Sequence, residues 1–526
     1  MNNFWKNRKL LVFLLGLIIL SVFFRFYNFE NLIYWMFDEE RDVFIVKRIL
    51  IDKHFTLIGG AIPGAFYLAP GYFYISAVFY WLSGLNPIGP AIAASTLGVI
   101  STFLVFFVSL KFFDKKTAVF ASLFYCVSYL IVGYNRTWWP LTFGPVISLV
   151  TYYSLYRIIK NRRFIWSFPL TIALIIGAHS DPSNFSLIIL TVILLIIYKV
   201  PPNRYIKLSI FLFLFSHLPL VIFDLRHNFF NSKLIFKMLT FGSNSTGLDL
   251  NNLLSSLMLF PQTLSRLIYV KDPDWSLQIV PFKFYLDKKF NEIPIFIFII
   301  STLILFWFAA KTIKALFSKD DLPTKIIGIH FLIALAGVVL YNIFFPNYTY
   351  EWFLQVLFAN FTIIIGLLIS RLIKFQPLTL LIWIVFGIYL FVSIWTFNGA
   401  KNPYGFGSKS QAVKWAISQV GSKDFSLDAP SSSFSYGGYR YLFYLFGHEP
   451  VKSYMDPVFV DWIYPASKIS TDHPDTVVVI MNPDLFFDQT YWDSYQAYLT
   501  KTISRKKFSE KIEVLIVDNS DKWVDW

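Results

Sequence analysis

Long apolar segments separated by short charged ones constrain this chain more than any other feature. Segments of about 16–22 apolar residues are long enough to cross a bilayer as helices. We identify eleven, near residues 10–26, 89–110, 118–133, 141–156, 164–178, 185–198, 208–223, 292–310, 326–345, 353–369 and 378–396. The expected fold class is therefore mainly α, a polytopic transmembrane helical protein.

Composition supports this class and excludes others. Of the 526 residues, 56% are hydrophobic and only 15% are charged. The net charge of +14 would indicate a nucleic-acid partner in a soluble protein. Here the basic residues lie mostly between apolar segments, where they orient helices, so we expect no nucleic acid. Cys126 is the single cysteine, which excludes an intramolecular disulfide and fits inert packing.

The basic residues also predict an orientation. If the N-terminus is cytoplasmic, the inside segments 1–9, 111–117, 157–163, 199–207, 311–325 and 370–377 hold 19 Lys and Arg residues. The short outside loops 134–140, 179–184 and 346–352 hold only Arg136. A basic start before residues 10–24 also resembles a signal peptide, but no small-residue cleavage site follows. We expect an integral protein of the cytoplasmic (plasma) membrane, with an uncleaved first span.

Two domains are expected. Residues 1–397 form the membrane domain, with a first outer loop at 27–88 and a large outer loop at 224–290. The aromatic stretch 66–82 fits either a twelfth span or a helix at the interface, and we favour the second because a span would invert the charge pattern. Residues 398–526 form a small extracytoplasmic α/β domain. Its expected elements are helices at 409–419 and 438–446, an apolar run at 425–427, and strand-like runs at 476–481 and 512–517.

A short acidic run, 37–42, follows the first span. Carboxylates are costly near a bilayer, so a cluster there is expected to bind or react with something. In the structural interpretation, Asp38, Glu39, Glu40 and Asp42 complement a helix dipole or cap a helix. In the functional interpretation, one of them is a general base. Arg41 would lie on the same helix face as Asp38, where it could position that carboxylate or neutralise a phosphate.

The order of motifs adds a family resemblance. The acidic run is followed by Ala-Pro-Gly-Tyr-Phe-Tyr at 69–74, Leu-Ser-Gly-Leu-Asn-Pro at 82–87 and Tyr-Asn-Arg-Thr-Trp-Trp-Pro at 134–140. This combination resembles the GT-C membrane glycosyltransferases. Within them it is most similar to the protein-mannosyltransferase and aminoarabinose-transferase-like (RgtA/B/C/D-like) group. The resemblance covers about residues 5–400 in architecture and the first 190 in motif detail.

The resemblance implies an integral membrane glycosyltransferase of GT-C type. Its expected partners are membrane lipids, a polyprenyl-phosphate sugar donor, and a lipid, glycan or protein acceptor on the extracytoplasmic face. The family's first-loop acid maps onto Asp38, the expected general base, with Glu39 beside it. Outer cations that could stabilise the leaving phosphate are Arg41, Arg136, Arg226, His179 and His227.

The chain departs from the family where many relatives carry a second acid, at the end of the third span. Asn135 and Arg136 stand there, so a two-carboxylate metal site is in doubt and these two residues could touch the donor phosphate directly. A divalent cation is still open, with ligands unknown. The remaining expected substrate-binding residues are Asp42, His179 (followed by Asp181), Tyr350 and Glu351. Aromatic-belt or helix-capping roles compete at the last three.

Two other functions compete. A transporter or lipid flippase would share the many spans, but ion-coupled transporters usually carry Asp or Glu inside them, and the predicted spans contain none beyond Glu292, the first residue of the span 292–310. In a non-catalytic envelope scaffold, the acidic run would have no function. The aromatic stretch 436–441 in the tail fits a carbohydrate-stacking surface or interface packing equally well.

Overall fold

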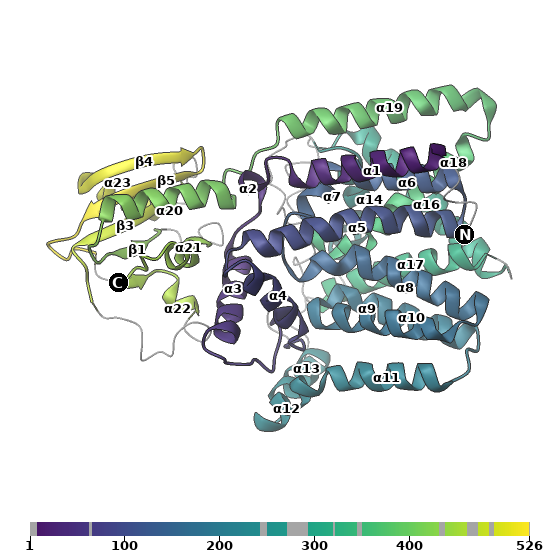
Figure 1. The fold of residues 1–526 in the computed structure, drawn as a ribbon, viewed down its shortest axis with the longest axis horizontal. Coiled ribbons are helices and arrows are strands. Elements are labelled where there is room, and N and C mark those ends of the chain that lie inside the picture. Colours follow the sequence, from purple (N-terminus) through teal and green to yellow (C-terminus); the bar gives the residue numbers. More distant parts are fainter. Residues whose placement is uncertain are drawn as a thin grey trace.

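The structure, a computed structural model, describes residues 8–62, 66–241, 250–270, 293–318, 321–344, 350–430, 437–459, 472–482 and 489–524. The membrane domain is an elongated helical bundle, and a smaller domain containing a β-sheet lies beyond one of its ends (Figure 1). The mainly α fold class and the small C-terminal α/β domain are therefore as expected.

The eleven expected spans all coincide with helices. Among the described residues, seven helical segments are long and apolar enough to cross a membrane. Four are single helices: α1 (Arg8–Phe26), α5 (Ile88–Phe112), α16 (Ile295–Leu316) and α19 (Gln376–Asn398). The other three are Leu322–Asn342 within α17 (Leu322–Phe344), α11 (Arg204–Ser216) continued by α12 (Leu218–Arg226), and η6 (Glu351–Leu357) continued by α18 (Phe358–Leu372). The remaining four expected spans are shorter, interrupted or more polar: α6 (Lys115–Val127) with α7 (Tyr129–Tyr134), α8 (Gly144–Asn161), α9 (Ser167–Ser180) and α10 (Phe185–Ile197).

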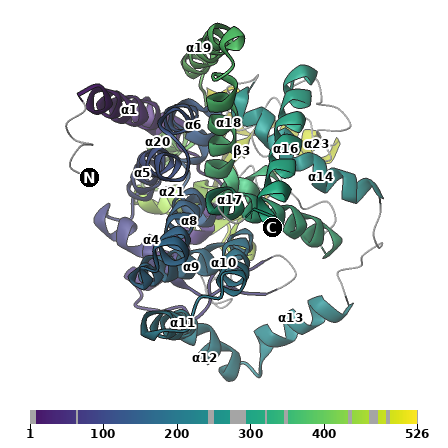
Figure 2. The same cartoon turned by 90° about the vertical axis from the view of Figure 1, so that its right-hand side faces the viewer.

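The helices pack most closely where small residues let backbones approach. Gly366 of α18 faces α6, and a Cβ there would lie 2.7 Å from the Thr117 carbonyl oxygen. His330 is a buried polar residue of the bundle with a partner at each ring nitrogen. The His330 ring contacts the Tyr152 hydroxyl through Nδ1 (2.5 Å) and the Ser186 hydroxyl through Nε2 (2.9 Å). In the end-on view, α1, α11 and α19 lie at the rim, where apolar side chains face outward (Figure 2).

The two ends of the bundle differ in charge. The turns α5–α6, α10–α11, α16–α17 and α18–α19 share the end where α1 begins (Figure 1). Contacts confirm this: the Ser370 hydroxyl donates to Asp114 (2.9 Å), and the Lys311 ammonium lies 6.0 Å from the Phe113 ring. These are the basic segments predicted to lie inside.

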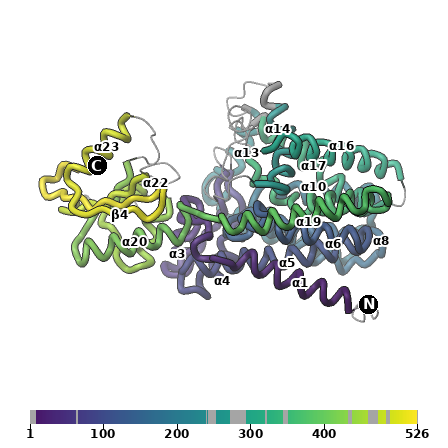
Figure 3. Tube along the Cα trace, turned by 90° about the horizontal axis from the view of Figure 1, so that it is seen from above, coloured from purple at the N-terminus to yellow at the C-terminus, as the bar shows by residue number. Residues whose placement is uncertain are grey.

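The opposite end carries the first loop. Three helices, α2 (Phe29–Leu32), α3 (Phe37–Leu50) and α4 (Gly71–Leu82), lie between the bundle and the C-terminal domain (Figure 1). Figure 3 shows α3 and α4 there from above. At 12 residues, α4 is about 18 Å long and too short to span a bilayer. Its length agrees with the interfacial helix favoured from the charge pattern.

The large outer loop contains two helices that hydropathy did not predict, α13 (Phe230–Phe241) and α14 (Leu250–Ile268). The second half of α14 is buried against the bundle, and α14 packs on α16 and α17. The rest of that loop includes residues 271–292, which lie outside the described residues.

The C-terminal domain is a sheet covered by helices on both faces. The described strands are β1 (Ser426–Asp428), β2 (Lys452–Ser453), β3 (Thr476–Met481), β4 (Thr502–Ser509) and β5 (Ile512–Asp518), in the order β2-β1-β3-β5-β4. The β1–β2 and β1–β3 pairs are parallel, and the others are antiparallel. The helices are α20 (Phe406–Val420), α21 (Tyr439–Leu445), α22 (Asp456–Phe459) and α23 (Gln489–Thr500).

Alternation along β3 explains the two covered faces. Val478 and Ile480 belong to the cluster that includes α20, whereas Val477 and Val479 pack with the tyrosines of α23. Because both faces are buried, the strand reads as a continuous apolar run, which is why it could be predicted to the residue. The expected helices at 409–419 and 438–446 correspond to α20 and α21.

Candidate active site

The acidic run forms the first turn of α3. Asp38, Glu39 and Glu40 all lie in that turn, where negative charge complements the helix dipole. Glu39 also accepts a hydrogen bond from the Met36 backbone N–H through Oε2 (3.0 Å). Glu39 therefore has the capping role of the structural interpretation. Because successive helix residues point about 100° apart, the other carboxylates face different surroundings.

Asp38, Arg41 and Asp42 form an ion-paired group on one side of α3. Arg41 donates to Asp38 Oδ1 through Nη1 (2.9 Å) and to Asp42 Oδ1 through Nε and Nη2 (2.9 and 2.7 Å). The Asp42 side chain is 5% exposed, whereas the Asp38 side chain is 50% exposed. Burial lowers the pKa of Arg41, but the two carboxylates more than offset this and raise it. Arg41 thus stays cationic and holds an accessible carboxylate, that of Asp38, in place.

Glu39 lies in a different environment. It is buried, and its Oε1 has no hydrogen-bond partner among the described residues. Burial, together with the neighbouring charge of Asp38, raises the pKa of Glu39 to about 8. The carboxyl group is therefore mostly protonated at neutral pH, which distinguishes it from the ion-paired Asp38.

Tyrosines surround this turn. The Tyr72 hydroxyl of α4 lies near Asp42 and Glu39, and burial together with their charges raises the pKa of Tyr72. Tyr34 is within electrostatic range of Glu39 and Asp38, and also of Tyr134 at the end of α7. Tyr34 therefore lies near both the acidic run and Tyr134, the first residue of the motif 134–140.

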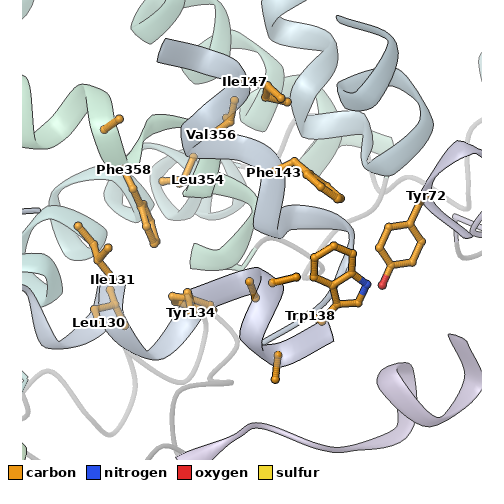
Figure 4. Packing of buried hydrophobic residues seen from close by; sticks show 14 of the residues in the cluster. Tyr72, Leu130, Ile131, Tyr134, Trp138, Phe143, Ile147, Leu354, Val356 and Phe358 are labelled. Carbon is orange, nitrogen blue, oxygen red and sulfur yellow. The ribbon is translucent and has the colours of Figure 1, made fainter. Parts of the chain in front are cut away.

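The α7–η1 turn supports α4. Trp138 donates from its indole Nε1 to the Ser76 hydroxyl of α4 (2.8 Å), and Tyr72 lies beside this indole (Figure 4). Trp138 also packs edge-to-face on Phe143 of η1 (Pro140–Phe143). The motif 134–140 is thus a buried platform on which the first outer loop rests.

His179 contacts α4 rather than the acidic run. Its Nδ1 accepts a hydrogen bond from the Gly71 N–H (3.1 Å), the first amide of α4, and its Nε2 lies 3.2 Å from the Ser216 hydroxyl. A Cβ at Gly71 would lie 2.5 Å from this Nδ1, so glycine is required there. Asp181 accepts from the Ser183 N–H, and burial raises the pKa of Asp181 to about 6.

Asn135 and Arg136 lie at the end of α1. Arg136 is fully buried and donates through Nη2 to the carbonyls of Phe24 (2.5 Å) and Tyr27 (3.0 Å), which satisfies the C-terminus of α1. Asn135 accepts from Arg25 Nε (3.0 Å). Asn135 also contacts α5, because its backbone carbonyl accepts from the Ser95 hydroxyl (3.2 Å). The expected role of Asn135 and Arg136 at the donor phosphate stays a prediction.

Glu351 and Tyr350 lie at the start of η6. Glu351 is buried and accepts from Arg266 of α14 (2.5 Å) and from the Tyr134 hydroxyl (3.0 Å). Tyr350 stacks on Trp352, with ring centroids 4.0 Å apart. Trp139 stacks on Tyr134, and its ring centroid lies 6.2 Å from that of Trp352. Partly exposed aromatic rings therefore adjoin a buried ion pair.

Sequence reasoning missed Arg266, Tyr34, Tyr72 and the contacts of Glu40. Arg266 lies in a segment that reads as polar loop, so only the fold shows its pairing with Glu351. Tyr134 directly precedes Asn135 in the motif 134–140 and could have been predicted as a site residue together with it. The remaining outer cations, Arg226 and His227, are exposed at the end of α12, where His227 Nδ1 contacts the Phe223 carbonyl of its own helix (2.7 Å).

The described residues hold no group of three or more His, Cys, Asp or Glu side chains arranged to bind a metal ion. The side chains near Asp38 instead form one guanidinium paired with two carboxylates.

Together these features define a class: a polytopic membrane protein whose acidic first-loop helix lies between the bundle and a C-terminal α/β domain. No protein-family model matches the chain. No curated protein matches it either.

The chain is similar to several solved structures. One is ArnT from Cupriavidus metallidurans bound to undecaprenyl phosphate, with 12% identity and a TM-score of 0.49 over 96% of this chain and 97% of that chain. Another is the oligosaccharyltransferase AglB from Archaeoglobus fulgidus in complex with an inhibitory peptide and a dolichol-phosphate, with 12% identity and a TM-score of 0.44 over 90% of this chain and 70% of that one.

Proposed function

We propose that this protein is a GT-C-type membrane glycosyltransferase that moves a sugar from a polyprenyl-phosphate donor to an envelope lipid, glycan or protein on the extracytoplasmic face. The observation that carries the proposal is the half-exposed Asp38 carboxylate, ion-paired to Arg41 on the first-loop helix. A general base must reach its substrate, and Asp38 is the carboxylate of the first turn of α3 that is accessible.

The chemistry follows from this placement. Asp38 accepts the proton of the acceptor hydroxyl, and the acceptor oxygen forms a bond to the anomeric carbon of the sugar. The bond from that carbon to the lipid-phosphate oxygen breaks, and the phosphate leaves with the electron pair. Because attack and departure take place on opposite sides of the carbon, the configuration inverts.

Arg41 acts together with the proposed base, Asp38, in this reaction. It bridges Asp38 and Asp42, so it holds the base in place beside a positive charge. We assign Glu39 a neutral, structural carboxyl group beside the base, on the ground of its burial. The Tyr350, Trp352 and Trp139 rings offer faces on which a sugar can stack, next to the Arg266–Glu351 pair.

The test compares wild type with Asp38→Asn in membranes supplied with radiolabelled polyprenyl-phosphate sugars. Loss of a general base lowers turnover by about 10²–10⁴-fold. The matched control is Asp52→Asn, the same change at an exposed residue just past the end of α3. We expect Asp38→Asn to fold, to keep donor binding and to lose turnover, while Asp52→Asn matches wild type.

Two results would contradict the proposal in different ways. Full turnover in Asp38→Asn would move the base to another carboxylate, Glu39 or Asp181 first. Absence of turnover in well-folded wild type with every donor, with acceptor-containing membranes present, would favour a transporter or flippase.

A further inference from the structure

A buried polar network joins the acidic run to the C-terminal domain. The residues on the first-loop side are Trp35 and Glu40, and those on the C-terminal side are Lys409 of α20 and the start of α21. Trp35 is 1% exposed, and Glu40 and Lys409 are fully buried. Charged residues so far from water require complete pairing, so the contacts of these two define what they do.

Glu40 uses both of its carboxylate oxygens on the other domain. Oε2 accepts from the Gly438 N–H (2.6 Å), and Oε1 accepts from the Tyr441 N–H (2.8 Å). These amides belong to the N-terminal turn of α21, where unpaired N–H groups attract a negative charge. Glu40 therefore caps a helix that lies about four hundred residues further along the chain.

Lys409 fixes the other side of the same turn. Its ammonium donates to the Trp35 carbonyl (2.8 Å) and to the Gly437 carbonyl (2.6 Å). The Trp35 indole donates in return to the Gly438 carbonyl (2.7 Å). Backbones also meet here, because a Cβ at Gly437 would lie 2.6 Å from the Cα of Phe37.

These contacts enclose the turn that carries Asp38. Phe37 lies one residue before Asp38 and touches Gly437, and Glu40 lies two residues after it and is bonded to α21. The side chain of Asp38 itself is left half-exposed. Contacts on both sides of a residue fix the direction of its side chain, which is what a base needs in order to meet an acceptor hydroxyl.

We propose that the C-terminal domain positions the acidic run, with Glu40 and Lys409 as the positioning residues that hold the first turn of α3 against α20 and α21. The assignment of a catalytic purpose to this contact rests on the proposed function. The contact itself does not, and the experiment separates the two.

The experiment measures hydrogen exchange and turnover on full-length protein in lipid nanodiscs. In Glu40→Gln the amide NH₂ of the new side chain faces a backbone N–H donor, so one of the two bonds is lost. In Lys409→Met both carbonyls lose their donor. The matched controls are Glu510→Gln and Lys401→Met, because Glu510 and Lys401 form an exposed ion pair in the same domain (2.8 Å).

We expect exchange in segments 36–42 and 437–445 to rise at least tenfold in Glu40→Gln and Lys409→Met, with the membrane helices unchanged. We expect kcat to fall at least tenfold while KM for the donor changes less than twofold. Glu40→Asp keeps the carboxylate, so it should restore part of the protection from exchange and part of the kcat. The control variants should match wild type.

Unchanged exchange in both segments would overturn the proposal. So would raised exchange with wild-type kcat, because the contact would then be structural only. If wild type turns over no donor, the exchange result still decides whether Glu40 and Lys409 hold the turn. If Glu40→Gln loses protection from hydrogen exchange throughout the molecule, Glu40→Asp and Lys409→Met test the proposal instead, by the same changes in exchange and kcat.

Discussion

Three adjacent carboxylates at the start of α3 have three different environments. Asp38 is half-exposed and ion-paired, Glu39 is buried with an unpaired oxygen among the described residues, and Glu40 is buried and bonded through both oxygens. The helical rotation of about 100° per residue produces this separation. Three neighbouring carboxylates therefore differ in the structure: Asp38 is the proposed base, Glu39 is a buried acid and Glu40 contacts the C-terminal domain.

The buried Glu39 predicts a pH-dependent stability. In the unfolded chain this carboxyl ionises near its ordinary pKa of 4.5, and in the folded protein burial raises the pKa to about 8. Between these values the folded state holds a proton that the unfolded state has lost. Ionisation thus favours unfolding, by about 1.4 kcal/mol for each pH unit, and the penalty stops growing above about pH 8.

We therefore expect Glu39→Gln to gain stability over wild type as the pH rises from 5 to 8, with no further gain above pH 8. The measurement is the difference in Tm between the two proteins in detergent at each pH, with Asp52→Asn as the exposed control. A constant difference across this range would show that Glu39 titrates normally in the folded protein.

At the scale of elements, local pattern decides what can be predicted. The helices α1 and α5 and the strand β3 were predicted because each is apolar along its whole length. Helix α14 was missed because serines and asparagines interrupt its apolar residues. In the structure one of these, Ser256, is buried and accepts from Asn342 of α17 (2.7 Å). The sequence alone does not show the partner of such a buried polar residue, so a helix that contains several of them resembles a loop.

The placement of α4 by His179 gives a prediction at this scale. His179→Ala would leave the Gly71 N–H without its acceptor, at a cost of about 1–3 kcal/mol. We expect a lower Tm and greater hydrogen exchange in segment 71–82. The control is His227→Ala, because His227 is exposed and contacts only its own helix turn in the described contacts. Equal effects of the two variants would contradict a specific role for His179 at α4.

At the scale of the whole molecule, the bundle separates a basic end from an acidic, aromatic end. The charge pattern predicted which loops share each end, and the contacts confirm it. The candidate site could be predicted only in part, because its contacts span the chain. Asp38 and Arg41 are three residues apart, whereas Glu40 and Gly438 are 398 residues apart. No local pattern could have joined them.

The orientation of these two ends in the membrane is a separate prediction, and the chain is well suited to test it. Its single cysteine, Cys126, is fully buried, so wild type gives no labelling background. Asp52 is exposed at the acidic end and Lys374 at the basic end. With a membrane-impermeant maleimide on intact cells, we expect Asp52→Cys to be labelled at once and Lys374→Cys only after permeabilisation. The reverse pattern would place Asp38 on the cytoplasmic face, and because the proposed transfer requires donor and acceptor outside, it would exclude that reaction while leaving the fold intact.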